Sequence, residues 1–200
     1  MNQDYQAPAS FVEIRIQALP EFATFDDLTQ FIARSAVSES TLISNAQNKE
    51  GKTVFLSHSS KDKTYLAGVI TVLENHGGRV YVDDGDSRLP ATPCKETAAI
   101  LRGTIRGMSR FVVFVTTNSK DSRWIPWELG LGDAYQTPSN VALFPTSKDP
   151  YEQKWAQQEY LGLYQHIVWG HMEGIEKACW MVYDHTQNTG VTLGRWLRHD

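Results

Sequence analysis

The chain has 200 residues, 41% of them hydrophobic and 11% aromatic, which suits one sizeable core and is too little for two full domains with a linker. Its formal net charge is -4, with 19 basic and 23 acidic residues interspersed and no Lys/Arg run, so we expect no nucleic-acid partner. No stretch approaches the roughly 18 uninterrupted apolar residues of a membrane span, and residues 1–10 lack the basic start and apolar segment of a signal peptide. We therefore expect a cytosolic protein with no membrane partner.

Residues 1–51 are interpreted as an N-terminal extension and linker, ahead of a main domain over residues 52–200. Loose alternation from Phe11 to Leu19 predicts a half-buried strand. Thr24 to Asp27 resembles a capping box with an acidic first turn, which predicts the start of a helix. The polar stretch from Ser38 to Lys52 is interpreted as the linker.

From about residue 52 apolar strands alternate with amphipathic helices, the pattern of a parallel sheet with helices on both faces. Gly77 and Gly78 indicate a helix end before the second strand. The predicted strands are Thr53–Ser57, Arg79–Asp83, Arg110–Thr116, Asn140–Pro145 and His166–Trp169. The predicted helices are Lys61–Asn75, Cys94–Gly107, Ser122–Tyr135, Tyr151–Tyr160 and Gly174–Asp184.

In such a sheet, ligands collect beyond the carboxyl ends of the strands. The segments to inspect are therefore Ser57–Asp62, Asp83–Arg88 and Thr116–Trp127, which follow the first three strands. The two cysteines and six histidines show no ligand-like spacing, so we expect neither a disulfide framework nor a metal site.

Three segments resemble motifs of the TIR (Toll/interleukin-1 receptor) family, in the right order. Val54–Asp62 looks like its first strand and loop, and Val80–Asp84 with Leu89–Pro90 looks like its second strand and BB loop. Ser109–Val115 followed by Ser122–Leu129 is similar to its third strand and the Ser-x-Trp-x-x-x-Glu-Leu signature of NAD-cleaving members. The resemblance implies a flavodoxin-like α/β fold with a central five-stranded parallel sheet. It also implies cleavage of the nicotinamide–ribose bond of NAD+, as in the TIR proteins of antiphage (Thoeris-like) defence systems.

Cleavage of that bond develops positive charge on the ribose, which a nearby carboxylate stabilises. Glu128 is the candidate catalytic residue, and Trp124, four residues earlier, is a candidate substrate-binding residue on the same helix face. Nicotinamide leaves as a neutral molecule, so no metal or other cofactor is expected beside the substrate NAD+. The alternatives are a solvated carboxylate in a first helical turn and aromatic packing for Trp124 and Trp127.

Ser57 and His58 follow the first strand and are further candidates for substrate binding through ribose or phosphate oxygens. Helix capping by Ser59 or Ser60 is the alternative role of this loop, and both can hold at once. Asp83 or Asp84 is expected to face the ribose, with Asp83 preferred, and the alternative is a turn residue before Gly85.

The competing function is a non-catalytic TIR interaction module that acts by self-association. A nucleoside deoxyribosyltransferase-like enzyme is another alternative of the same reaction class. A phosphoacceptor receiver domain is excluded, because the acidic pair follows the second strand and the third ends in Thr116 and Thr117. The resemblance further implies sites completed between subunits, and an effector protein that reads the nucleotide product. Leu89–Pro93 departs from the BB loop pattern, which usually has a glycine soon after its proline.

Overall fold

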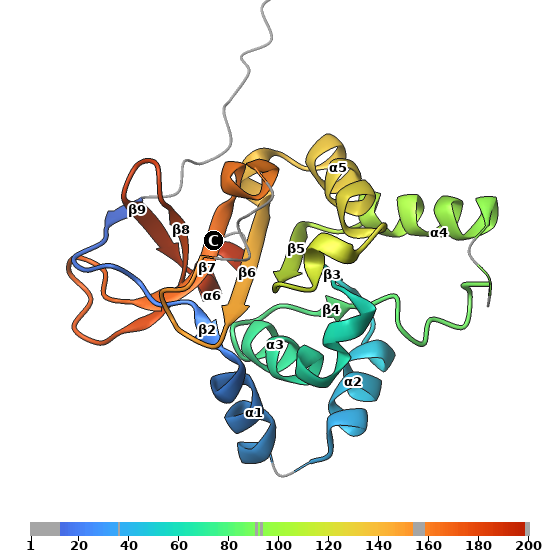
Figure 1. The fold of residues 1–200 in the computed structure, drawn as a ribbon, viewed down its shortest axis with the longest axis horizontal. Coiled ribbons are helices and arrows are strands. Elements are labelled where there is room, and N and C mark those ends of the chain that lie inside the picture. Colours follow the sequence, from blue (N-terminus) through green and yellow to red (C-terminus); the bar gives the residue numbers. More distant parts are fainter. Residues whose placement is uncertain (1–12, 36, 91, 93, 154–158, 199–200) are drawn as a thin grey trace, which may run out of the picture.

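The computed structural model describes residues 13–35, 37–90, 92, 94–153 and 159–198 (Figure 1). Five strands pair in parallel. Their spatial order is β4 (Val80–Tyr81), β3 (Val54–Ser57), β5 (Arg110–Val115), β6 (Val141–Ser147) and β7 (Gln165–Gly170). This is the 2-1-3-4-5 order of flavodoxin-like folds. The predicted five-stranded parallel sheet is therefore confirmed.

The sheet continues beyond β7 with three antiparallel strands. They are β8 (Cys179–Asp184), β9 (Thr189–Thr192) and β1 (Ile14–Arg15). The helix predicted over Gly174–Asp184 is thus wrong. Trp180 and Val182 are buried on one face of the sheet and Met181 on the other, so the segment follows the two-residue period of a strand.

Helices cover both faces of the sheet (Figure 1). The helices of one face are α1 (Phe25–Arg34), α2 (Glu39–Asn48), α3 (Lys63–Asn75) and α6 (Leu193–Arg198), and those of the other are α4 (Lys95–Arg106) and α5 (Ile125–Tyr135). In β5, Val112 and Phe114 face the first group while Phe111 and Val113 face the second. Burial on both faces explains why this strand is apolar from Phe111 to Val115, after Arg110 at its start.

The N-terminal segment packs on this body. The predicted capping box is confirmed, because the Asp27 N–H donates to Thr24 Oγ1 and Asp27 accepts from the Thr24 N–H. Thr24 also belongs to β2 (Ala23–Thr24), which pairs with β6. The linker predicted over Ser38–Lys52 instead contains α2. Ser38 caps its start, and fully buried Ala46 fixes it against the core, so packing outweighs the poor helix propensity of its Ser and Asn residues.

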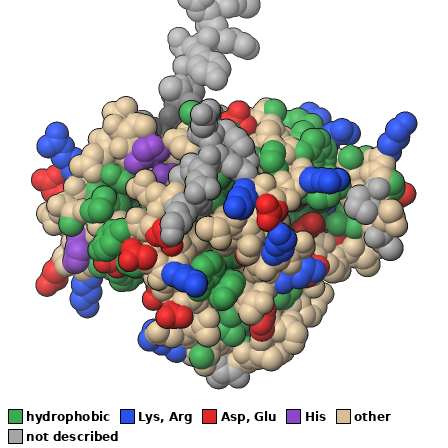
Figure 2. Space-filling model, in the orientation of Figure 1, with side chains coloured by type: hydrophobic (Ala, Val, Ile, Leu, Met, Phe, Trp, Pro, Cys, Tyr) green, Lys and Arg blue, Asp and Glu red, His purple; other side chains and the backbone are tan. Residues whose placement is uncertain are grey.

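Two other predicted elements differ in extent. The N-terminal strand is confirmed only at Ile14–Arg15, and Phe11 and Val12 lie outside the described residues. Residues 151–153 are not helical, residues 154–158 lie outside the described residues, and a 3₁₀ helix follows at Glu159–Leu163. No helix in the described part of the chain is long and apolar enough to cross a membrane. Acidic and basic side chains are interspersed on the face drawn in Figure 2.

Candidate functional site

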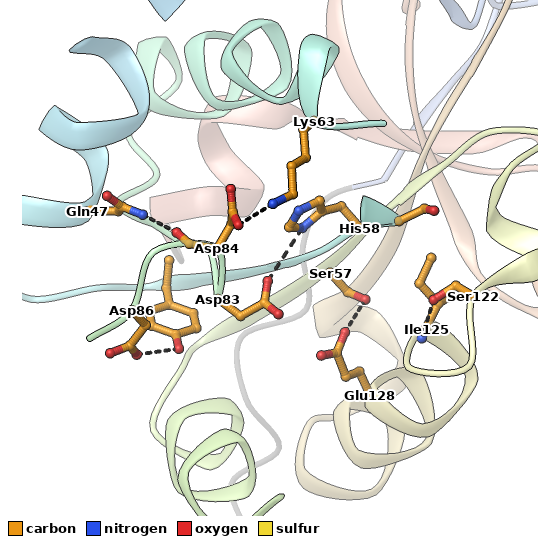
Figure 3. Close-up of polar contacts among 12 residues, drawn as sticks. Gln47, Ser57, His58, Lys63, Asp83, Asp84, Asp86, Ser122, Ile125 and Glu128 are labelled. Atoms are coloured by element: carbon orange, nitrogen blue, oxygen red, sulfur yellow. Dashed lines mark hydrogen bonds and ion pairs between the residues drawn. The ribbon is translucent and has the colours of Figure 1, made fainter. Parts of the chain in front are cut away.

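A small cavity of about 150 Å³ lies at the carboxyl ends of β3 and β4 and the start of α5. It is at the switch point of the sheet, because the chain runs from β3 to β4 on one side and from β5 to β6 on the other. Its lining residues share polar or aromatic character, and they are His58, Ser60, Lys63, Asp83, Asp84, Ser122, Trp124 and Glu128. Of the five predicted site residues, four line this cavity, and the fifth, Ser57, is hydrogen-bonded to Glu128 (Figure 3).

The local sequence places Glu128 in the first turn of α5. Ser122 Oγ accepts the Ile125 N–H at 3.2 Å, and Pro126 takes a first-turn position where no N–H donor is needed. Further along the helix, a Cβ on Gly132 would lie 2.6 Å from the Phe111 ring. The absence of a side chain at Gly132 therefore lets α5 pack directly on β5, which brings Glu128 over the strand ends.

Glu128 is buried, with 3% of the residue exposed. Ser57 Oγ donates to Glu128 Oε2 at 2.5 Å. Burial and the nearby Asp83 charge raise the pKa of Glu128 to about 8, against the Ser57 hydrogen bond, which lowers it. Glu128 is therefore not the solvated carboxylate of the alternative interpretation. A carboxyl group with such a raised pKa inside a cavity is typical of a functional site.

Asp83 and His58 lie beside this carboxyl group (Figure 3). His58 Nδ1 is 3.7 Å from Asp83 Oδ1, beyond hydrogen-bond distance. The His58 side chain is 4% exposed and that of Asp83 is 39% exposed. Among the described residues, His58 Nδ1 has no hydrogen-bond partner, so a bound ligand with a hydroxyl group would satisfy it.

Lys63 and Asp84 form an ion pair at the cavity (Figure 3). Both side chains are about half exposed or less, at 51% and 38%. The sequence did not single out Lys63, because it lies in the first turn of α3 rather than in a strand-end loop. A basic residue opening the helix that follows the first strand was the available signal, since that helix begins at the same edge of the sheet.

The loop residues divide between the site and its support. Ser59 Oγ accepts the Lys61 N–H at 3.3 Å, so the alternative capping role holds at Ser59, for the 3₁₀ helix Ser60–Asp62 that leads into α3. Ser60 lines the cavity. Buried Asp62 accepts hydrogen bonds from Thr116 Oγ1 at 2.8 Å and from Asn118 Nδ2 at 2.6 Å. These bonds join the loop after β3 to the loop after β5, and so hold two sides of the site together.

The two tryptophans have different positions. Trp124 is half-buried and lines the cavity beside Glu128. Trp127 packs edge to face on Trp124, with ring centroids 5.2 Å apart. The guanidinium group of Arg102 lies over the Trp127 ring, 5.6 Å from its centroid. Trp127 thus has a packing position, as expected.

Size alone does not identify the site. A larger hollow of about 770 Å³ lies between α1, α2 and α3. Its lining contains one carboxylate, Glu74, which is paired with Lys49. It is away from the strand ends and lacks the group of titratable side chains that surrounds Glu128.

A flavodoxin-like sheet with a buried carboxyl group at its switch point places the chain among the doubly wound α/β proteins, in which ligands collect at the strand ends. The TIR domain family matches residues 54–178, and the chain belongs to this family. It is 33% identical over 150 residues, 74% of this chain and 76% of the relative, to the "Probable 3' cyclic ADP-D-ribose synthase ThsB'" of Bacillus cereus strain MSX-D12. It is 31% identical over 88 residues, 42% of this chain and 23% of the relative, to the "Putative cyclic ADP-D-ribose synthase TIR2" of Cytobacillus dafuensis.

Proposed function

We propose that this protein cleaves the nicotinamide–ribose bond of NAD+ and releases nicotinamide with an ADP-ribose-type signalling nucleotide. The observation that carries the proposal is the buried Glu128 carboxyl group in a strand-end cavity, hydrogen-bonded to Ser57 and bordered by Trp124. The names of the two relatives, both cyclic ADP-D-ribose synthases, support the same chemistry. By the same analogy, the product acts in antiphage immunity and an effector protein reads it.

In the proposed reaction the bond between the ribose C1′ and the nicotinamide nitrogen breaks, and its electron pair leaves with nicotinamide. The Glu128 carboxylate stabilises the positive charge that develops on the ribose. Ser57 orients the carboxylate, His58 and Asp83 bind the ribose hydroxyls, and Trp124 offers a flat surface to an aromatic ring. The leaving group is neutral, so the reaction needs neither a metal nor a cofactor.

A cyclic product is favoured over hydrolysis by the burial of Glu128, which is 3% exposed. Water has poor access to a cation formed beside this carboxylate. A nucleophilic atom of the same nucleotide then captures C1′ and releases a proton. Capture by water instead gives linear ADP-ribose.

NAD+ is larger than the cavity. Sites for ligands of drug size measure roughly 300–1,000 Å³, against about 150 Å³ here. The Lys63–Asp84 ion pair must therefore open, or a second copy of the chain must add to the site. We propose that self-association completes it.

The test is incubation of purified protein with NAD+ and mass spectrometry of the products. We expect nicotinamide together with a cyclic or linear ADP-ribose from the wild type, and a loss of at least about 100-fold in Glu128→Gln. EDTA should leave the rate unchanged. Absence of nicotinamide over a range of protein concentrations, including conditions that promote assembly, would leave the non-catalytic interaction module as the function.

A further inference from the structure

The chain forms two successive turns directly after β4. The Asp86 N–H donates to the Asp83 carbonyl at 3.1 Å, and the Leu89 N–H donates to the Asp86 carbonyl at 3.0 Å. Gly85, the third residue of the first turn, has a φ of 81°, the left-handed conformation that a type II turn requires there. Asp83 is the first residue of that turn and its carbonyl accepts the hydrogen bond that closes it, so the turn restrains the residue whose carboxylate lies beside Glu128.

Helix α2 reaches this turn through one side chain. Gln47 Nε2 donates to the carbonyl oxygen of Asp84, which belongs to the central peptide of the turn (Figure 3). A Cβ on Gly85 would lie 2.7 Å from Gln47 Nε2, so a side chain at this position would displace the amide from its contact. Types I and II differ in the orientation of this central peptide, and only one orientation presents the carbonyl to Gln47. The amide therefore selects one conformation of the turn.

The helix itself is anchored to the core. Ala46, next to Gln47, is fully buried, and Lys52 Nζ donates to its carbonyl oxygen. Lys49 forms an ion pair with Glu74 of α3. Gln47 thus belongs to a helix that is held in place by the core. It does not line the cavity around Glu128, and it contacts the turn from outside that cavity.

We propose that Gln47 is a positioning residue of the site. By holding the Asp84–Gly85 peptide, it keeps the Asp83 carboxylate beside Glu128 and the Asp84 carboxylate beside Lys63. Helix α2 precedes the family match at residues 54–178, so a segment outside that match contributes to the geometry of the reaction. The inference rests on the proposed function for its effect on catalysis, and on the structure alone for its effect on the turn.

The test compares Gln47→Leu, which removes the amide, and Gln47→Glu, which keeps the shape but cannot donate, with Asn48→Leu as the matched control. Asn48 is the neighbouring, exposed amide of α2 and donates to Ser44 Oγ at 3.4 Å. In both Gln47 variants we expect hydrogen exchange at the Asp86 and Leu89 amides to accelerate by about 5-fold, and kcat/KM for NAD+ to fall by about the same factor. The control should match the wild type in both.

A second readout separates positioning from a loss of stability. The charged or titratable groups that line the cavity with Glu128 are His58, Lys63, Asp83 and Asp84. When the turn loosens, Asp83 moves away from Glu128 and its repulsion weakens. The midpoint of the acid limb of kcat/KM should then shift to lower pH in Gln47→Leu, which adds no charge, and stay in place in the control.

The outcomes are distinguishable. A wild type that does not cleave NAD+ overturns the proposed function, and hydrogen exchange still decides whether Gln47 holds the turn. An active wild type whose Gln47 variants match the control in exchange, and in pH midpoint for Gln47→Leu, overturns the inference. So does a loss of activity that only follows thermal stability, with the pH midpoint unchanged.

Discussion

Burial and repulsion by Asp83 act on the Glu128 carboxyl group in the same direction, and both favour its protonated form. The proposed reaction needs the anion, because only a negative charge stabilises the cationic ribose. The positively charged nicotinamide ring of NAD+ supplies the opposite influence when it binds beside the carboxyl group. The free protein thus keeps Glu128 largely neutral near pH 7, and the substrate promotes its ionisation.

Because the free protein favours neutral Glu128 and the reaction needs the anion, kcat/KM should depend on pH. With a pKa of about 8 in the free protein, kcat/KM should rise with pH and level off above about 8. Asp83→Asn removes the repulsion, so its midpoint should lie at lower pH than that of the wild type. Initial rates at low NAD+ concentration between about pH 6 and pH 9 measure both profiles. A wild-type profile that is flat over this range contradicts the assignment of Glu128.

The raised pKa of Glu128 also predicts a change in the stability of Glu128→Gln. The folded-state pKa of about 8 lies above the ordinary value of 4.5, so the folded protein binds this proton more tightly than the unfolded chain. The resulting stability is fully present below pH 4.5 and is lost as the pH rises through about 8. Glutamine carries no charge and still accepts from Ser57. Glu128→Gln should therefore exceed the wild type in Tm at high pH, by about 2–4 °C for each kcal/mol gained, and the gain should vanish towards acid pH.

Calorimetric melts of both proteins across the pH range check this. The control is Glu96→Gln, an exposed carboxylate in the first turn of α4, which should show no such gain at high pH. A Glu128→Gln variant that is less stable than the wild type at every pH would contradict the conclusion that burial destabilises the charged form of Glu128.

At the scale of elements, close packing of α5 on β5 positions the site. Gly132→Ala should push α5 away from Phe111, because its Cβ would lie 2.6 Å from the ring. We expect a loss of about 1–3 kcal/mol in the free energy of unfolding and a lower kcat from displacement of Glu128. Gly130→Ala on the same helix is the matched control. With nothing within 4 Å of its Cβ, it should stabilise the protein by about 0.5–1 kcal/mol. Urea denaturation of the two variants measures the difference, and equal effects would contradict the close contact.

Sequence patterns predicted those elements whose burial is uniform. The apolar runs of β3, β5 and β6 are buried on both faces and are bounded by polar loops, so their type was readable. Helix α2 was missed because its sequence is mostly polar, and its helical structure is stabilised by capping at Ser38 and by packing of Ala46 and Ile43 on the core. Strand β8 was missed because a short apolar run has no period that separates strand from helix until its partner β7 is known.

The position of ligand sites at strand ends led to the loops that carry Ser57, His58, Asp83 and Trp124. Glu128 came from the resemblance to the TIR signature. The structure brings all five to one edge of the sheet. Their roles stay predictions. The sequence did not predict the contacts that the strand-end loops make with the helices. The ion pair of Lys63 with Asp84 and the contact of Gln47 with the turn join residues whose proximity depends on helix packing.

At the scale of the whole molecule, the division of the chain into an extension over residues 1–51 and a TIR domain over residues 52–200 also stays a prediction. Within the described residues, Leu28 of α1 and Ala46 of α2 are fully buried in the core cluster that includes Val69 of α3. Removal of residues 1–51 would therefore uncover apolar surface on α3. The extension contributes to the stability of the body that carries the site.

The size of the cavity gives the last prediction, because a cavity of about 150 Å³ is smaller than a site for a ligand of the size of NAD+. If a second copy completes it, the active species forms by mass action, and specific activity should rise with protein concentration and level off once assembly is complete. Light scattering coupled to size exclusion, run at the concentrations of the assay, shows whether mass and specific activity rise together.

A second experiment adds inactive Glu128→Gln protein to dilute wild type and tests directly whether a second copy completes the site. A variant that still assembles should raise the activity of the wild type by supplying the missing side of its site. Constant specific activity over a 100-fold range of monomeric protein, or no stimulation by the inactive variant, would place the complete site within one chain and require the Lys63–Asp84 pair to open instead.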